Sequence, residues 1–458
     1  LLKTSDETVQ PRQRTLRALI DWSHDLLTPP ERIVFQRLSV FAGGWTLEAA
    51  EAVCAGDGVE QDDVLDLLSQ LVDKSLVMLD AEDGRYHMLE TVRQYAAERL
   101  EGAEDAAAVR LAHLKYFLAY VAHSRSIGIG ANPEEWLHRL GMEHENFLAA
   151  HAAADGPIAE PQLGMQLLSS LRAYWLFRGI PGIGLQLTLD ALQRPSSTPR
   201  DAARCRSLFD AGQISYFMGQ YAEALVWMEG SLDIAKGIAN QPRIAMALQM
   251  LVSIATALGR FDEASDFGLQ AIALARDIGD QREIACAANA LAQLYRLRHR
   301  THEAQLLCEE AAEIARSIAD KALVIIALLN LAMLAIDRGE QREATQGLTE
   351  LVDLVAQTQS QMLGMSALDA CAGLASLLAD WSHAATFYAA AEAFTQVSGL
   401  RRDPTDTAFL LPYIERARAA ASASEFDAAS LLGSSMTIES ALAHAKAWLS
   451  RDRQVKSR

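Results

Sequence analysis

The chain has 458 residues, of which 50% are hydrophobic and 7% aromatic, and its formal net charge is −18. This length exceeds one compact core, so we expect several domains or a repeat solenoid, and the acidic surface argues against general binding to nucleic acid or anionic membranes. Five scattered cysteines without a Cys-x-x-Cys pair, no signal-peptide core and a longest apolar run of fifteen residues (322–336) indicate a cytoplasmic protein without a membrane span.

Residues 1–102 carry helical patterns followed by a hairpin pattern. Helices are expected over residues 11–27, 28–41, 43–54 and 60–75, with Thr28 and Thr46 as N-terminal caps. Alternating residues then predict a β-hairpin that pairs Leu76–Leu79 with Tyr86–Met88 through a turn at Asp83 and Gly84, and a closing helix follows. Helices followed by a small β-hairpin are typical of a winged-helix domain.

Residues 161–400 repeat with a period of forty. A turn residue, in most units glycine, recurs at that spacing, and an alanine stands five places after it. The turn positions are Gly179, Gly219, Gly259, His299, Gly339 and Ala379, and the alanines are Ala224, Ala264, Ala304, Ala344 and Ala384. Apolar residues at helical spacing on both sides of each turn predict two helices per unit. Because one unit cannot bury its apolar face alone, the units must stack.

The pattern Gly-x-aromatic-x-x-Ala, at Gly219/Tyr221/Ala224 and Gly259/Phe261/Ala264, resembles the core of the tetratricopeptide repeat. That repeat has about thirty-four residues, so the longer period indicates longer helices or linkers. The resemblance implies an all-α fold with a right-handed solenoid, in which the first helix of each unit lines a concave groove.

A second resemblance covers nearly the whole chain. The segments RQRTLRALIDWSHDLL, RLSVFAGGWTLEAAEAVC, LVDKSLV and YHMLETVRQYAAERL are similar to the winged helix of bacterial STAND-type regulatory ATPases. Members combine an NB-ARC-like nucleotide switch, a winged helix and a tetratricopeptide sensor, and many are LuxR- or AfsR-type transcriptional regulators. WLHRLGMEHENFLAAHAAA resembles the family's bridge, and FDAASLLGSSMTIESALAHA its closing helices. The resemblance implies a winged helix at 1–102, a helical bridge at 103–160, repeats at 161–400, and capping helices with a basic tail at 401–458.

The nucleotide switch of that family has no counterpart in the sequence. A phosphate-binding loop needs Gly-Lys-Ser/Thr, and none of the seven lysines follows a glycine. We therefore expect a fragment equivalent to the family's C-terminal half, which hydrolyses no ATP, with ATP or ADP bound only by an N-terminal domain outside it. Met88, Leu89 and Glu90 stand in place of the family's Met-His-Asp motif, so Leu89 is expected to begin a packed helix instead of contacting a nucleotide.

Direct reading of DNA by the winged helix is not expected. Residues 1–100 contain ten Lys/Arg and eighteen Asp/Glu, and the expected helix over 60–75 is rich in aspartate. Catalytic and metal sites are not expected either, because His299 and His302 share a turn without a third ligand nearby and no nucleophile motif is present.

Polar side chains recur on the predicted inner face of three consecutive units. Positions four and seven apart share one face of a helix, and apolar residues such as Leu248 and Leu291 occupy the opposite face. The candidate groove residues are Phe209, Gln213, Tyr216, Gln249, Ser253, Thr256, Asn289, Gln293 and Arg296. Such a column suits an extended peptide or a small polar ligand, with Arg296 as the anchor for a carboxylate. The alternative is that these residues only solvate an empty groove.

These patterns predict the sensor part of a STAND-type signalling protein. Its repeats would bind a protein or small-molecule effector and control a nucleotide switch. Two other functions stay open: a tetratricopeptide scaffold for protein–protein interaction, and a winged-helix transcriptional regulator that binds DNA.

Overall fold

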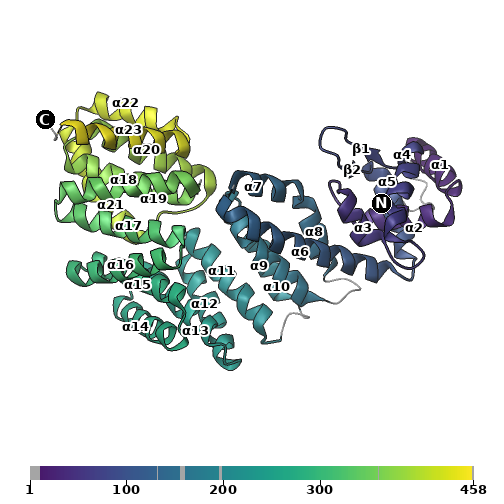
Figure 1. Ribbon diagram of the computed structural model, residues 1–458, viewed down its shortest axis with the longest axis horizontal. Helices are drawn as coiled ribbons and strands as arrows, with labels where there is room; N and C mark the ends of the chain where they lie inside the picture. Colours follow the sequence, from purple (N-terminus) through teal and green to yellow (C-terminus); the bar gives the residue numbers. More distant parts are fainter. Residues whose placement is uncertain (1–10, 132, 155–159, 195–198, 359, 456–458) are drawn as a thin grey trace. The chain divides into compact units, whose positions relative to one another are not determined.

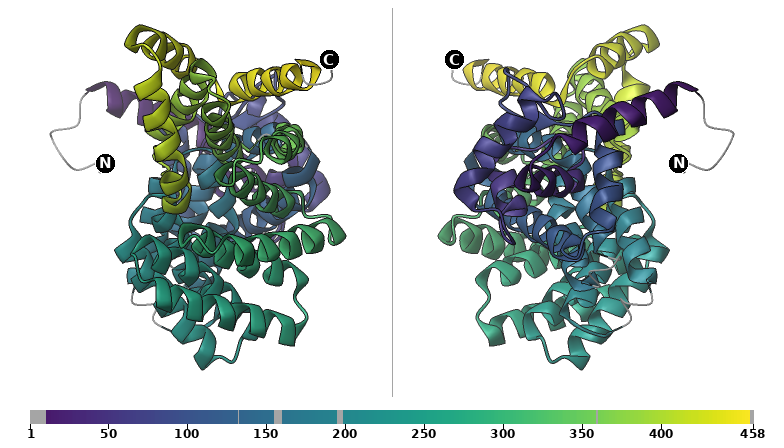
Figure 2. Two further views of the ribbon diagram at one scale, coloured as in Figure 1. Left: turned by 90° about the vertical axis from the view of Figure 1, so that its left-hand side faces the viewer. Right: turned by 90° about the vertical axis from the view of Figure 1, so that its right-hand side faces the viewer.

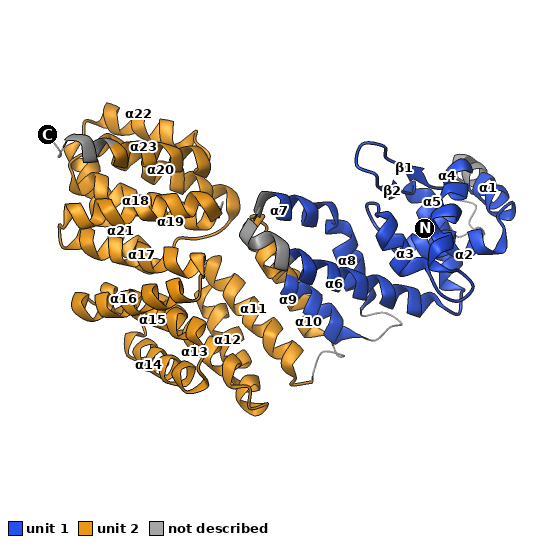
Figure 3. Cartoon of the chain, viewed as in Figure 1, with its two compact units in different colours: residues 1–129, 135–170 blue, residues 130–134, 171–458 orange. Residues whose placement is uncertain are grey.

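The computed structural model describes residues 11–131, 133–154, 160–194, 199–358 and 360–455, and this part of the chain is almost wholly helical (Figure 1). The all-α prediction is therefore confirmed. The chain divides into two compact units, one of residues 1–129 and 135–170 and the other of residues 130–134 and 171–458 (Figure 3).

The first unit opens with the helices and hairpin expected of a winged helix. Its elements are α1 (Pro11–Asp25), α2 (Pro29–Arg37), a 3-10 turn (Leu38–Val40), α3 (Leu47–Cys54), a second 3-10 turn (Gln61–Asp63), α4 (Val64–Asp73), β1 (Met78–Leu79), β2 (Tyr86–His87) and α5 (Glu90–Glu101). The antiparallel hairpin is confirmed but shorter than predicted, because the Leu76 and Val77 amides bond back to the Leu71 carbonyl at the end of α4. Trp45 extends the hairpin on its other side through two backbone bonds to Tyr86.

Both predicted caps are present, whereas Leu89 differs from expectation. The Thr46 hydroxyl accepts the Ala49 amide at 3.3 Å, and the Thr28 amide donates to the Glu31 carboxylate at 2.6 Å. Leu89 is the N-cap of α5 and is 56% exposed, so the expectation that it packs was wrong. The buried side of α5 begins only at Val92.

Four helices follow: α6 (Ala106–Ala131), α7 (Pro133–Met142), α8 (His144–Ala153) and α9 (Pro161–Phe177). Within the first unit, α6 and α8 pack on the winged helix. Phe117 of α6 lies edge-on to both Phe41 and Phe147, and the Asn146 amide group accepts from the Ala42 N–H at 2.8 Å.

The second unit is an array of helix pairs that stack one after another (Figure 1 and Figure 2). They are α10 (Pro181–Gln193), which follows α9, then α11 (Ala202–Phe217) with α12 (Tyr221–Gly237), α13 (Gln241–Ala257) with α14 (Phe261–Ile278), α15 (Gln281–Leu297) with α16 (Thr301–Ser317), α17 (Lys321–Asp337) with α18 (Gln341–Thr358), and α19 (Gln361–Leu377) with α20 (Trp381–Ser398). The chain ends in α21 (Pro404–Ala420), α22 (Ala423–Ser434) and α23 (Ile438–Val455).

The predicted turn positions are confirmed residue by residue. All six have positive φ, from 55° at His299 to 78° at Gly219, which is the left-handed region that ends a helix. His299 and Ala379 adopt this conformation without being glycine, at a cost that the surrounding packing offsets.

The recurrent alanines form the centre of the array. Ala224, Ala264, Ala304, Ala344 and Ala384 are all fully buried. A methyl side chain at these positions lets the two helices of a pair approach closely. The apolar run over 322–336 forms the buried helix α17, and no described helix combines the length and hydropathy needed to cross a membrane.

Candidate functional site on the inner face of the repeats

The first helices of the pairs, α11, α13, α15, α17 and α19, form one face of the array, which we call the inner face. Neighbouring members of this set contact one another directly. All nine candidate groove residues lie on α11, α13 and α15, and none is exposed. Phe209, Tyr216, Thr256, Asn289 and Arg296 are buried, and Gln213, Gln249, Ser253 and Gln293 are half-buried.

A segment of the same chain covers this face. We call residues 399–407, which connect α20 to the first turn of α21, the strap. The Arg401 amide donates to the Phe217 carbonyl at 2.8 Å, and the buried Tyr216 hydroxyl donates to the Asp403 carboxylate. One small cavity is lined from the inner face by Tyr216, Ser253, Thr256 and Gln293 and from the strap by Asp403, Pro404 and Thr405. The inner face therefore already holds a segment of this chain, which is non-helical up to Asp403 and helical from Pro404.

Arg296 shows most clearly how the strap is held. Its guanidinium donates to Asp406 at 2.7 Å, and the two side chains are only 3% and 7% exposed. Weaker contacts reach the Thr405 hydroxyl and carbonyl at 3.4 and 3.5 Å. The expectation that Arg296 projects into an open groove needs correction: it grips a carboxylate, but that carboxylate belongs to this chain.

Burial governs the electrostatics of this pair. It raises the pKa of Asp406 to about 7, and Asp403 and Asp369 push in the same direction while Arg296 lowers it. Removing a carboxylate from water disfavours its charged form, and one guanidinium offsets only part of that penalty. Asp406 is therefore held in a site where its charge is costly.

Arg402 makes a second buried attachment of the strap. Its Nε donates to Asp369 of α19 at 2.8 Å, and its Nη1 donates to Glu392 of α20. Asp369 is 1% exposed, and burial raises its pKa to about 6 against the lowering effect of Arg402. The strap is thus attached by one basic side chain, Arg402, and by two acidic ones, Asp403 and Asp406.

Beyond the strap, α21 contacts α13, α15, α19 and α20. A side chain at Gly373 of α19 would place its Cβ 2.8 Å from the Phe409 ring, so glycine permits this close approach. Further along, the Tyr413 hydroxyl donates to Asp337 of α17 at 3.0 Å. In contrast, α22 packs on α20, and α23 packs on α18 and α19, as capping helices do.

The remaining candidate residues divide into two kinds. Gln213 accepts a hydrogen bond from Arg172 of α9, so its amide is engaged. Asn289 is 4% exposed, and neither its Nδ2 nor its Oδ1 has a hydrogen-bond partner among the described residues. Leu329, Met333 and Ile336, the apolar continuation of the column on α17, are buried.

Sequence reasoning missed the acidic partners of this site. No role was predicted for Arg402 or for the aspartates Asp369, Asp403 and Asp406. The segment RRDPTDT is nevertheless a dense cluster of charges and hydroxyls, with a proline that begins a helix. No periodic pattern links this cluster to α15, so only the three-dimensional structure pairs it with Arg296.

The winged helix carries exposed acidic side chains on one helix. Asp62, Asp63 and Asp66 are exposed at the beginning of α4. Among the described residues, no group of three or more His, Cys, Asp or Glu side chains is arranged to hold a metal ion.

Comparisons with known families confirm both components of the predicted architecture. A model described as a winged helix-turn-helix domain matches residues 27–101, and a tetratricopeptide repeat model matches residues 204–277. A third model, described as anaphase-promoting complex subunit 5, matches residues 314–369 within the repeats.

Curated relatives occur in mycobacteria. Proteins of Mycobacterium tuberculosis and Mycobacterium bovis that bear the provisional name HTH-type transcriptional regulator are 40% identical over 214 residues, which are 45% of this chain. The match spans only 24% of each relative's length.

Two solved structures match this chain at low sequence identity. A Rap protein complexed with competence and sporulation factor matches with a TM-score of 0.50 and 13% identity, covering 94% of this chain and 99% of that one. A STAND protein with a tetratricopeptide repeat sensor from Pyrococcus horikoshii gives a TM-score of 0.44 and 14% identity, covering 98% of this chain and 69% of that one.

Proposed function

We propose that this chain is the sensor part of a regulatory protein, whose repeats bind an effector peptide or protein segment on their inner face. The observation that carries the proposal is the strap: the inner face binds two aspartates of this chain, Asp403 and Asp406, through Tyr216 and Arg296. The name of the mycobacterial relatives, and the similarity to a Rap protein complexed with competence and sporulation factor, are consistent with this role. Control of an N-terminal nucleotide switch is the further part of the proposal.

The charges of the strap define what an effector must provide. An effector that displaces residues 403–406 removes the carboxylate partner of the buried Arg296 guanidinium. Leaving a buried charge without a partner costs about 3–5 kcal/mol in measured cases. A competitor therefore needs a carboxylate that reaches Arg296 and a second acceptor for the Tyr216 hydroxyl. This requirement selects a peptide segment with two acidic residues at the spacing of Asp403 and Asp406, which lie at the N-cap and in the first turn of α21.

The test uses a labelled synthetic peptide of residues 399–409, GLRRDPTDTAF. The receptor is the full chain with Asp403→Asn and Asp406→Asn. Both replacements keep side-chain size, and an asparagine side chain at the first position can still cap α21. Fluorescence anisotropy should show the peptide binding this variant at least about tenfold more tightly than the wild-type chain, whose own strap competes.

The matched control is the same peptide with both aspartates replaced by asparagine. This control peptide should bind the variant at least about tenfold more weakly than the peptide that keeps both aspartates, because hydrogen bonds to charged groups are stronger than those to neutral groups. Equal binding of the two peptides, or no binding to a variant with an unchanged circular dichroism spectrum, would contradict the proposal.

A further inference from the structure

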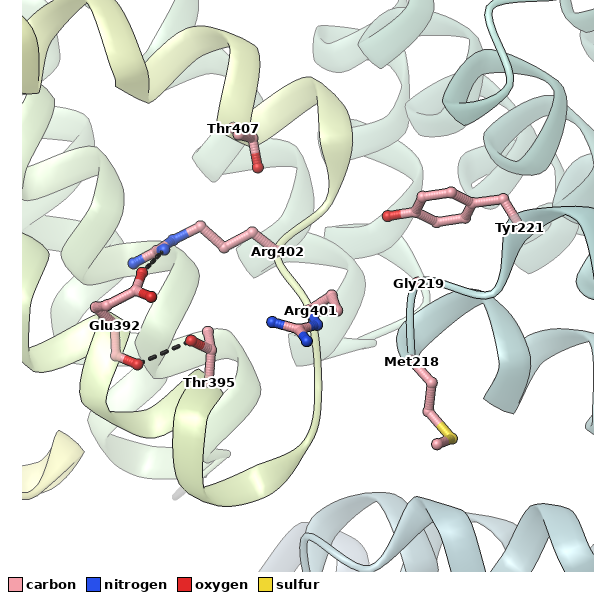
Figure 4. A pocket seen from close by; sticks show the side chains of 8 residues that line it. All are labelled: Met218, Gly219, Tyr221, Glu392, Thr395, Arg401, Arg402 and Thr407. Carbon is pink, nitrogen blue, oxygen red and sulfur yellow. Dashed lines mark hydrogen bonds and ion pairs between the residues drawn. The ribbon is translucent and has the colours of Figure 1, made fainter.

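A pocket of about 480 Å³ lies beside the strap, and none of the candidate groove residues lines it (Figure 4). One side is formed by the turn after α11 and the beginning of α12, and the other by α20, the strap and the first turn of α21. Polar side chains dominate its lining: Tyr221, Glu392, Thr395, Arg401, Arg402 and Thr407. A cavity of this size falls within the range of about 300–1,000 Å³ that small-molecule sites occupy.

The pocket has more positive charge than its own carboxylate neutralises. Glu392 is already ion-paired with Arg402, whose Nε is bound by Asp369. The guanidinium of Arg401 has no hydrogen bond or ion pair with any described residue, and its side chain is exposed. The site thus keeps one unneutralised guanidinium at its edge.

A second unused donor lines the pocket. The hydroxyl of Tyr221 has no hydrogen-bond partner among the described residues, whereas the guanidinium of Arg402 is bound by Asp369 and Glu392. In contrast, the Thr395 and Thr407 hydroxyls donate to backbone carbonyls of Glu392 and Asp403. An anion in the pocket would accept hydrogen bonds from the Arg401 guanidinium and from the Tyr221 hydroxyl.

We propose that this pocket binds the phosphate group of a small phosphorylated molecule, with Arg401 and Tyr221 as donors. These residues approach from opposite sides, the arginine from the strap and the tyrosine from α12, as Figure 4 shows. A planar carboxylate matches a single guanidinium fork, whereas the three terminal oxygens of a phosphate monoester are tetrahedrally arranged and can take donors from several sides. The remaining volume accommodates the organic part of the ligand.

Gly219 keeps this arrangement open. It has a φ of +78°, and a Cβ there would lie 3.1 Å from Cγ of Arg401. Glycine therefore serves both the turn and the placement of the arginine stem against it.

Isothermal titration calorimetry of the full chain, in buffer free of phosphate and sulfate, tests the proposal with glycerol 3-phosphate and inorganic phosphate as probes. Glycerol 3-phosphate should bind at one site. Arg401→Gln should weaken binding at least about tenfold, because it removes a charged donor, and Tyr221→Phe should weaken it severalfold. Arg342→Gln, which changes an exposed arginine outside the pocket, should leave the affinity unchanged.

Four results would overturn the inference. The first three are wild-type affinity in Arg401→Gln, succinate binding as tightly as glycerol 3-phosphate, and no binding of either phosphate probe at about 10 mM, far above a millimolar dissociation constant. Arg401 is exposed, so its replacement should not disturb folding, and circular dichroism of each variant verifies this. Binding of inorganic phosphate alone, without glycerol 3-phosphate, would also overturn it, because the pocket would then exclude the organic part.

Discussion

Arg296 of α15 and Asp406 of α21 are 110 residues apart in the chain, yet their side chains meet at 2.7 Å in a site that is almost closed to solvent. The pair joins the middle of the repeat array to the segment that covers it. Arg296 is therefore part of an internal contact and not a free anchor for a ligand. Its replacement should consequently lower the stability of the fold.

Arg296→Ala should destabilise the second unit by about 3–5 kcal/mol, because it leaves the Asp406 carboxyl buried without its partner. Urea unfolding followed by circular dichroism measures the loss. Arg342→Ala, at an exposed position of α18, should change stability by less than about 0.5 kcal/mol. Arg296→Met with Asp406→Leu should recover most of the loss, since apolar groups of similar size need no partner. Equal stability of the two arginine variants would show that the pair is not a stabilising contact.

The stability of the strap should depend on pH in an unusual direction. The pKa of Asp406 in the folded chain is about 7, and an unfolded aspartate has a pKa of about 3.9. Between these values the folded state binds more protons than the unfolded state, so this group's contribution to the unfolding free energy decreases as the pH rises from about 4 to about 7.

Asp406→Asn removes the titrating group and should flatten that slope by up to about 1.4 kcal/mol per pH unit. Asp369 has a pKa of about 6, so it adds a smaller decrease of the unfolding free energy with rising pH, and the Asp406→Asn variant retains this contribution. Urea denaturation of both chains at several pH values compares the slopes. A wild-type slope that is unchanged in the variant would refute the assignment of this proton to Asp406.

Two turn glycines provide a matched pair for the strap contact. Gly219 and Gly259 have nearly the same φ, 78° and 74°, but only at Gly219 would a Cβ meet the strap, at Cγ of Arg401. Replacement by alanine should cost about 1–2 kcal/mol of backbone strain at either site. Only Gly219→Ala should in addition weaken binding of glycerol 3-phosphate, which calorimetry would detect. Equal affinities of the two variants for glycerol 3-phosphate would show that the close approach of Gly219 to Arg401 does not matter for binding in the pocket.

The repeat array was predictable because its signal is local. Each turn at Gly219 or Gly259 is encoded within a few residues, by a glycine that adopts the left-handed conformation and by a later alanine that is buried. The same local pattern recurs in the units that stack on one another. The strap was not predictable in this way. Tyr216 meets Asp403 across 187 residues, and neither periodicity nor spacing relates the two. Helix geometry was enough to predict that the polar residues share one face. Their partners could not be predicted, because they belong to the strap and α21, which pack on that face only in the folded structure.

Nucleotides should bind this chain weakly or not at all. The sequence has no Gly-Lys-Ser/Thr loop, so ATP and ADP should not bind with micromolar affinity. The pocket at Arg401 can take one phosphate group, and any weak binding of ATP should therefore disappear in Arg401→Gln and persist in Arg342→Gln. Calorimetric titration of the three chains with ATP and ADP distinguishes the cases. Micromolar affinity that survives Arg401→Gln would reveal a nucleotide site elsewhere in the chain, and it would contradict the assignment of nucleotide binding to a separate N-terminal domain.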